Sequence, residues 1–407
     1  MTEIDHRTEL PRRRLLAAGL GAAGLAAWPL RPAIAQSGDI VIGAAPPITG
    51  VFAFAGVGLH QGLNDYCEWR NTKGGIQGRK LRYIGEDSGY KMDQAMSVFK
   101  KIMGANNNPP AFYGDSTAWA KAASKEVSQM GTTLTSSPSF SSDLADPKNA
   151  PYYFMAGPTY TAMGEILLEY IHRTSRGATK PAVAIVYSDT EFGRDPIPGI
   201  KAKAGKLQIP IVQEIVTKPG AVDVSGEVAK LRRAKPDYVI FHGYVLAPIP
   251  DFIKQMRESG MSATPMGTIW SMDKSTVDAM GAAAQGWMGV MPYRYSYDTE
   301  GAPTMQTLVE YIKKTRPGTS YVTLFHTHGW LVGMIFSEVI ERCLKAKKPL
   351  TGPNMKAALE SINDWDTGGI TGLLASLKGH QIASGRVYQY NPASKLMEPA
   401  SGWIKTA

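Results

Sequence analysis

Short apolar runs alternate with helical patterns along most of this chain. In the first half, strands are predicted at 39–45, 80–87, 111–114 and 132–136, and helices at 59–71, 93–104 and 116–130. The alternation then repeats, with helices at 161–173, 198–207, 225–234 and 248–260 and strands at 182–187, 211–216 and 238–241. Regular β-α alternation predicts doubly wound parallel sheets that helices cover on both faces. Because the pattern occurs twice, we expect an α/β fold with two lobes.

The loops that follow the predicted strands are the expected place for a ligand. In open parallel sheets, ligands bind beyond the carboxyl ends of the strands. These loops are 46–50, 114–119, 136–144, 188–195, 242–248 and 267–274. They are rich in Ser, Thr, Gly and aromatic residues, which is the composition that a cleft for a small molecule needs.

The N-terminal segment has the pattern of an export signal. Three arginines, Arg12–Arg14, precede an uncharged stretch at 15–30, and Ala33-Ile34-Ala35 then offers a small-x-small cleavage site. We therefore expect a signal peptide at 1–35 and a periplasmic location. The consecutive arginines before Leu-Leu resemble a twin-arginine signal, and Sec export remains the alternative. The G-x-G-x-x-G match at 19–24 lies inside this leader with no strand before it, so it does not indicate a dinucleotide site.

Composition and charge are those of an ordinary globular protein. Hydrophobic residues make up 43% and charged residues 19% of the 407 positions, as in typical soluble domains. The net charge of +9 is scattered, and no basic stripe interleaves with aromatic residues, so no nucleic-acid partner is expected. Cys67 and Cys343 are the only cysteines, and they lie in predicted helices at 59–71 and 329–344. A disulfide is one interpretation in an oxidising compartment, but we expect two buried free thiols.

Catalytic and metal-binding motifs are missing from the sequence. It contains no G-x-S-x-G, no P-loop, no H-E-x-x-H and no cysteine pair at metal spacing. His326 and His328 offer two imidazoles, but no third ligand lies nearby in sequence. Asp115, Glu191 and Asp195 flank turns and are interpreted as solvated or capping carboxylates. We therefore expect no enzyme, no cofactor and no metal, with an enzyme on this scaffold as a minor alternative.

Several segments together resemble a known protein family. They are the strand and turn at 40–50, the loop at 71–78, Tyr187–Gly193, the segment 226–237 and Gly286–Gly289. In order and spacing the chain, from about 39 to 400, resembles the periplasmic solute-binding proteins of branched-chain-amino-acid-type ABC importers. The resemblance implies the type I fold, in which two doubly wound parallel-sheet lobes are joined by a three-strand hinge and close on a ligand. It places the N-terminal lobe at 36–158 plus 291–383 and the C-terminal lobe at 159–290 plus 384–407.

The resemblance also implies how a ligand is held. Hydroxyl and backbone N–H groups of the first lobe, from the loops that carry Ser116, Thr117, Ser139 and Ser141, would hold the ligand's carboxylate at helix N-termini.

The partners that such proteins use for an ammonium group are replaced by apolar residues here. Phe192 and Ala55 stand where the family has tyrosines, and Ile269 or Trp270 stands where it has an acid. A buried ammonium without partners is costly, which disfavours a zwitterionic amino acid. Asp273 could still take that role.

Aromatic residues in the same loops would form the walls of the cleft. Flat apolar walls suit an aromatic or otherwise hydrophobic carboxylate, although each ring has a place in the core as its alternative. The expected wall residues are Phe54, Trp119, Tyr160, Phe192, Tyr244 and Trp270.

The leading hypothesis is an exported, monomeric binding protein that captures a small organic acid with an apolar or aromatic body and delivers it to a membrane permease. A binder of branched-chain amino acids, short amides or urea is the alternative within the same class. A ligand-sensing component of a membrane receptor is a further alternative, because fold alone does not settle function.

Overall fold

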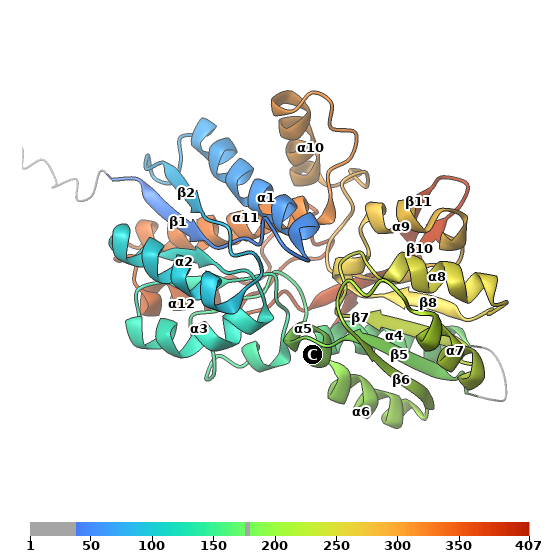
Figure 1. The fold of residues 1–407 in the computed structure, drawn as a ribbon. Coiled ribbons are helices and arrows are strands. Elements are labelled where there is room, and N and C mark those ends of the chain that lie inside the picture. The colour runs from blue at the N-terminus through green and yellow to red at the C-terminus, as the bar shows by residue number, and fades with distance from the viewer. Residues whose placement is uncertain (1–37, 176–179, 407) are drawn as a thin grey trace, which may run out of the picture. The chain divides into compact units, whose positions relative to one another are not determined.

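The computed structural model describes residues 38–175 and 180–406. The predicted signal peptide at 1–35 lies outside these residues, so the leader and its export route stay predictions. Residues Gly38–Ala407 form one compact unit, which contains two sheets (Figure 1).

The first sheet consists of four parallel strands in the order β2-β1-β3-β4. All residues of β1, β3 and β4 are buried, as expected for strands that helices cover on both faces. The strands are β1 (Ile40–Ala44), β2 (Leu81–Gly85), β3 (Ala111–Tyr113) and β4 (Leu134–Ser136). Helices α1 (Ala53–Thr72), α2 (Met92–Ala105) and α3 (Thr117–Met130) follow the first three strands, and the short 3-10 helix η1 (Ser142–Leu144) follows β4.

The second sheet repeats this winding and adds an antiparallel edge. Its order is β11-β10-β9-β8-β7-β5-β6, and β12 pairs with β10. Strands β5 to β9 pair in parallel, whereas β10 runs antiparallel to β9, β11 and β12. The strands are β5 (Val183–Ser188), β6 (Ile211–Thr217), β7 (Tyr238–His242), β8 (Thr264–Gly267), β9 (Met288–Met291), β10 (Ser384–Asn391), β11 (Leu396–Pro399) and β12 (Ile404–Lys405).

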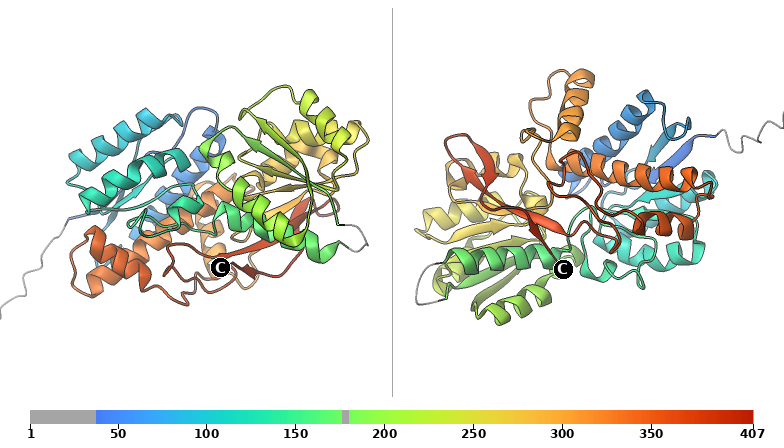
Figure 2. Two further views of the ribbon diagram at one scale, coloured as in Figure 1. Left: turned by 90° about the horizontal axis from the view of Figure 1, so that it is seen from below. Right: turned by 180° about the vertical axis from the view of Figure 1, so that it is seen from behind.

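Helix α4 (Tyr160–Thr174) leads into the second sheet, and short helices connect the strands that follow. These are α5 (Glu191–Arg194), α6 (Ile197–Leu207), α7 (Ser225–Ala234), α8 (Ile249–Glu258), η2 (Ile269–Ser271), α9 (Lys274–Met280) and η3 (Gly281–Ala284). After β9 the chain forms α10 (Pro303–Thr315), α11 (Leu324–Lys345) and α12 (Gly352–Glu360), and then returns to the second sheet as β10. Figure 2 shows α11 beside α1 of the first sheet.

The predicted α/β class with two doubly wound parallel sheets is confirmed. Each sheet places its first strand between its second and third, so that β1 neighbours β3 and β5 neighbours β7. The strand order reverses at these two positions, and ligands of open α/β sheets bind there. The lobe boundaries inferred from the resemblance stay a proposal.

Two predicted helix starts are wrong. Helix α11 begins at Leu324 rather than at Gly329, because the Thr323 side chain accepts a hydrogen bond from the backbone N–H of His326 and caps the helix five residues earlier. Helix α1 begins at Ala53 rather than at Leu59, since Gly56 and Gly58 interrupt the apolar pattern of its first turns. Apart from α11, the segments from β8 onward, including α9, α10, α12 and the antiparallel edge, were not predicted as elements.

Both cysteines are buried and free, as expected. Burial raises the pKa of the Cys67 thiol, which keeps it protonated and unreactive. Among the described residues, no helix is long and apolar enough to cross a membrane.

Glycines let helices α1 and α11 approach each other closely. A Cβ atom added at Gly62 would lie 2.1 Å from the carbonyl oxygen of His326, and one at Gly329 would lie 2.4 Å from that of Leu59. Both neighbouring atoms belong to the backbone, so they cannot swing aside. The close contact between these helices therefore requires glycine, which has no side chain, at both positions.

We expect Gly62→Ala to destabilise the protein by about 1–3 kcal/mol, because the added methyl group overpacks this helix contact. Gly104→Ala is the matched control, since Gly104 lies exposed in α2 with nothing within 4 Å of an added Cβ, and it should be neutral or stabilise by up to about 1 kcal/mol. Urea unfolding measures both changes, and equal stability of the two variants would contradict the close approach.

Candidate functional site

The loops after the strands of both sheets meet around one cavity. It lies beyond the carboxyl ends of β1 to β5, β7 and β8, and its volume is about 30 Å³. One water molecule occupies about that volume in the liquid. The first-sheet loops and helix starts contribute Pro47, Phe52, Ala55, Leu59, Tyr90, Asp115, Ser116, Thr117 and Pro138, and the second-sheet loops contribute Phe192, Val245 and Trp270.

The polar side chains of this cavity gather at the start of α3. Ser116 is the N-cap of that helix, and its hydroxyl accepts a hydrogen bond from the backbone N–H of Trp119 at 3.1 Å. The same hydroxyl donates to Asp115 Oδ1 at 2.6 Å, while the Ser88 hydroxyl donates to Asp115 Oδ2 at 2.9 Å. Ser116 therefore already uses its proton within the protein.

Asp115 is a buried carboxylate, not the solvated or capping group that the sequence indicated. Its exposed fraction is 1%, and no ion pair within the described part of the chain includes it. Burial raises the pKa of Asp115 to about 6, against the opposing effect of the hydrogen bonds from Ser116 and Ser88. The carboxylate is mostly ionised at neutral pH and keeps lone pairs that no protein donor uses.

Thr117 is the hydroxyl at this end that remains without a partner. Its Oγ1 atom is buried and makes no hydrogen bond in the structure, although the residue lines the cavity. The first N–H groups of α3 have no acceptor one turn earlier in the helix. This corner can therefore donate hydrogen bonds from Thr117 and the helix terminus, and it can accept them at Asp115.

The second sheet contributes two aromatic residues to the apolar walls. Phe192 and Trp270 line the cavity, and Tyr160 packs against Phe192 with ring centroids 5.0 Å apart. The Trp270 Nε1 atom donates to the Tyr160 hydroxyl at 2.9 Å, and that hydroxyl donates to the carbonyl of Pro138 at 3.3 Å. Tyr160 thus links Trp270 and Pro138 from behind the cavity wall, and its ring does not line the space itself.

His242 fixes the loop that carries Phe192. One imidazole nitrogen lies 2.9 Å from the carbonyl oxygen of Phe192 and the other lies 2.8 Å from the Thr268 hydroxyl. Burial lowers the pKa of His242 to about 3, so the ring is neutral and one nitrogen donates while the other accepts.

A charged network lies beside the cavity and connects elements of the two sheets. Lys121 Nζ in α3 lies 2.8 Å from Asp143 Oδ2, 3.3 Å from Glu191 Oε2 and 3.6 Å from Asp195 Oδ1. The Ser141 hydroxyl donates to Asp195 Oδ1, and the backbone N–H of Ser142 donates to its other oxygen at 3.2 Å. Asp195 is therefore buried and paired, which corrects its interpretation as a solvated or capping carboxylate.

Eight of the ten predicted site residues divide into three groups. Ser116, Thr117, Phe192 and Trp270 line the cavity. Ser139, Ser141 and Tyr160 are buried next to it. Phe54 does not line it: 39% of its surface is exposed, and its ring packs against Phe325. Their roles in ligand binding stay predictions.

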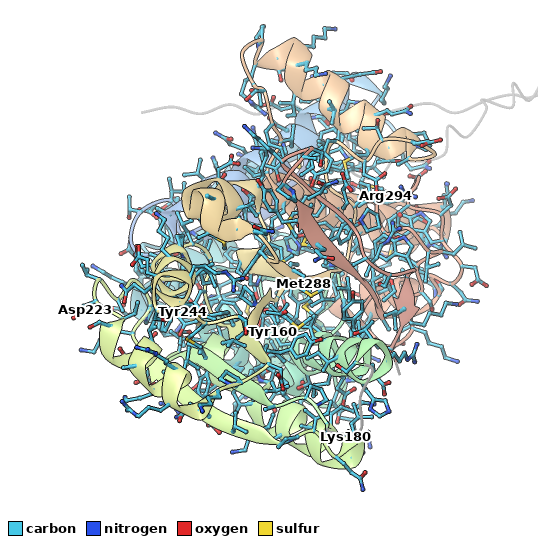
Figure 3. All side chains as sticks on the ribbon, turned by 90° about the vertical axis from the view of Figure 1, so that its right-hand side faces the viewer. Tyr160, Lys180, Asp223, Tyr244, Met288 and Arg294 are labelled. Carbon is cyan, nitrogen blue, oxygen red and sulfur yellow. The ribbon has the colours of Figure 1, made fainter. Side chains whose placement is uncertain are left out.

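The prediction of Trp119 and Tyr244 as cleft walls needs correction. The Trp119 indole lies in the core of the first sheet, 5.5 Å from Phe112 and 5.7 Å from Phe99 between ring centroids. Tyr244 is buried and its hydroxyl pairs with that of Thr217 at 2.8 Å; Figure 3 shows Tyr160 and Tyr244 inside the outline of the molecule, whereas Lys180 lies at its edge. In both cases the side chain packs on its own lobe.

Asp273 and the two histidines are occupied by structural contacts. Asp273 caps α9 and accepts from the backbone N–H of Leu324 at 2.9 Å and the Tyr321 hydroxyl at 3.1 Å, so it is not free to meet an ammonium group. His326 Nε2 lies 3.0 Å from Asp65, and His328 is buried among aromatic rings. Across residues 38–175 and 180–406 there is no group of three side chains suited to a metal ion.

The sequence missed several residues that line the cavity, including Phe52, Tyr90 and Val245. Pro47 and Val245 lie in loops that were singled out, but Tyr90 follows β2, whose loop was not considered. Tyr90 reaches the cavity because β2 neighbours β1 at the switch point of the first sheet.

We expect the burial of Asp115 to make stability depend on pH. The unfolded chain loses this proton near the ordinary pKa of 3.8, and the folded chain loses it only near pH 6. The protonated form thus stabilises the fold at low pH, and up to about 3 kcal/mol of that contribution is lost as pH rises through 6.

Asp115→Asn removes this loss, so the stability of the variant relative to the parent should rise by up to about 3 kcal/mol between about pH 4 and pH 7.5. Urea unfolding at both pH values measures it. Asp278→Asn, at an exposed pair with Lys274, is the control and should show no such rise; the same rise in both variants, or in neither, would contradict the assignment.

Comparisons with known proteins agree with this geometry. The family model described as periplasmic binding protein matches residues 39–395. The leucine-specific-binding protein of Salmonella typhimurium is 25% identical over 293 residues, which cover 71% of this chain and 76% of that protein.

Solved structures show the same fold. A branched chain amino acid ABC transporter from Thermus thermophilus with bound valine has a TM-score of 0.82 at 20% identity, covering 91% of this chain and 97% of that one. A solute binding protein of an ABC transporter from Rhodopseudomonas palustris BisB5, in complex with 3,4-dihydroxy benzoic acid, has a TM-score of 0.76 at 18% identity. The match covers 91% of this chain and 98% of that one.

These findings support an extracytoplasmic solute-binding protein of an ABC transporter, a role that consists of binding a small molecule and is not enzymatic. Since the family model covers most of the chain, the protein belongs to the periplasmic binding protein family and has the type I fold of its branched-chain-amino-acid-type members.

Proposed function

We propose that this protein captures a small organic acid with a hydrophobic or aromatic body between its two lobes and delivers it to the permease of an ABC importer. The observation that carries the proposal is the cavity itself, in which Phe52, Phe192 and Trp270 surround a space with a single polar corner at Asp115–Thr117. Apolar walls with a few convergent polar groups are typical of small-molecule sites.

The polar corner supports an acid as the ligand. The Thr117 hydroxyl and the N-terminus of α3 are hydrogen-bond donors, and a helix N-terminus favours negative charge. The solved structure with bound 3,4-dihydroxy benzoic acid is an aromatic acid complex on the same fold, which supports an aromatic body as one form of the ligand.

A branched-chain amino acid, short amide or urea remains the second candidate. The leucine-specific-binding protein and the structure with bound valine favour it, and so does the acceptor that Asp115 provides. A ligand-sensing component of a membrane receptor is a further candidate on the same fold.

Binding must include movement of the lobes in this proposal. The cavity of about 30 Å³ is far smaller than the roughly 300–1,000 Å³ of typical ligand sites, and its walls come from both sheets. We propose that the chain crossings near 158, 291 and 383 act as the hinge, and that the protein works as a monomer in the periplasm.

A thermal-shift screen tests the ligand class. Hydrophobic acids should raise the melting temperature, because ligand at a hundred times its dissociation constant stabilises by about 2.7 kcal/mol. Aromatic and aliphatic carboxylates, branched-chain amino acids, short amides and urea form the panel. Stabilisation by urea or acetamide alone would contradict a site built for an apolar body.

Phe192→Ala should weaken the best ligand of that screen by about 30-fold, since loss of a central buried anchor costs about 2 kcal/mol. Phe54→Ala is the matched control, because this ring is part-exposed and lies outside the cavity wall, and it should change the affinity little. Calorimetric titration measures both, and a larger loss in the Phe54 variant would reverse the assignment.

Lys121→Gln should weaken binding about fivefold, because Lys121 contacts Glu191 and Asp195 across the lobes and would favour the closed state that holds the ligand. A part-exposed pair of this kind contributes up to about 1 kcal/mol. The affinity of the variant should also depend less on salt. Lys274→Gln removes a lysine paired within one lobe and serves as control. Equal effects of the two substitutions would show that the network does not favour the closed state.

A further inference from the structure

A site that binds a ligand through the ligand's carboxylate alone leaves the carboxylate of Asp115 without a role. Asp115 lines the cavity, yet the hydrogen bonds to it in the structure come from two neutral serine hydroxyls. A buried anion without a cation is costly to maintain. A ligand that offers a hydrogen-bond donor would offset that cost.

A plain carboxylic acid fits this corner poorly. Its carboxylate would lie close to that of Asp115, and two neighbouring carboxylates cannot both ionise without a strong rise of one pKa. The Ser116 hydroxyl cannot relieve the conflict, because it donates to Asp115 and accepts from the backbone N–H of Trp119. Thr117 and the N-terminus of α3 are left at this corner to bind the ligand's negative charge.

The free hydroxyl of Thr117 points independently to a ligand at this corner. It is fully buried, has no hydrogen-bond partner and lines the same cavity. A threonine and an aspartate two positions apart at the start of one helix thus offer a donor and an acceptor to one molecule. Tyr90 lines the cavity too, and both burial and the Asp115 charge raise its pKa, so it stays a neutral phenol.

We propose that Asp115 is a specificity-determining residue that accepts a hydrogen bond from a hydroxyl or ammonium group next to the ligand's carboxylate, while Thr117 and the N-terminus of α3 hold the carboxylate. The inference rests on the proposed function and narrows it to hydrophobic 2-hydroxy or 2-amino acids. It makes Asp115 the partner of the ammonium or hydroxyl group, a role for which Asp273 is not free.

Two matched series of three compounds test the proposal. The first is 4-methylpentanoate, 2-hydroxy-4-methylpentanoate and leucine, and the second is 3-phenylpropanoate, 3-phenyllactate and phenylalanine. Within each series the body and the carboxylate stay constant and the donor changes from none to hydroxyl to ammonium. Calorimetric titration at about pH 7.5 keeps Asp115 ionised, since its pKa is about 6.

In the parent protein, at least one donor-bearing member of a series should bind about 10- to 100-fold more tightly than the plain acid, as expected for a hydrogen bond to a charged group. In Asp115→Asn this preference should shrink by a similar factor, and the plain acid should bind more tightly than it does to the parent. Asp278→Asn, which changes the same charge at the surface, should leave the preference unchanged.

The outcomes separate the two proposals. Plain acids that bind the parent as tightly as the donor-bearing acids, or a preference that Asp115→Asn leaves intact, would overturn the role of Asp115 while the proposed function stands. Failure of all six compounds to bind the parent, with its folding verified by thermal melting, would overturn both.

Discussion

Parallel strand pairing is the constraint on which the rest of this structure depends. Because helices return the chain to the same end of each sheet, all the loops that follow parallel strands gather at one edge. In this protein the edges of the two sheets supply opposite walls of one cavity, with Asp115 and Thr117 after β3 and with Phe192 and Trp270 after β5 and β8. Residues that are more than 150 positions apart therefore meet without any dedicated binding domain.

Two buried carboxylates near this edge serve different purposes. Asp195 is paired with Lys121 and receives hydrogen bonds from Ser141 and Ser142, so its charge is balanced within the protein and ties the two sheets together. Asp115 receives hydrogen bonds from the hydroxyls of Ser88 and Ser116 and has no cationic partner among the described residues. The charge of Asp195 is therefore balanced within the folded chain, whereas in our proposal Asp115 gains its best hydrogen-bond partner from the ligand.

Much of the fold could be predicted from the sequence, because apolar periodicity is set by burial on a sheet or on one helix face. Helix α7 was predicted with its bounds, and the other elements of the first 260 residues mostly to within one or two positions. The early start of α11 was missed because His326, Thr327 and His328 interrupt the apolar pattern, and the cap at Thr323 becomes evident only in three dimensions.

The candidate site could be predicted only as a set of loops. A loop aromatic residue can turn toward the cavity, as Phe192 does, or back into its own core, as Trp119 does, and sequence alone does not distinguish these. The buried Asp115 accepts a hydrogen bond from Ser88, which lies 27 positions away on another loop. Such a contact follows from the strand order, which local patterns do not reveal.

A crystal structure of the protein with 2-hydroxy-4-methylpentanoate or leucine, whichever binds more tightly, tests the central claim most directly. The account predicts the ligand between the lobes, with its body on Phe192 and Trp270, its hydroxyl or ammonium group at hydrogen-bond distance from Asp115, and its carboxylate at Thr117 and the start of α3. A ligand bound elsewhere, or one whose donor group turns away from Asp115, would contradict it.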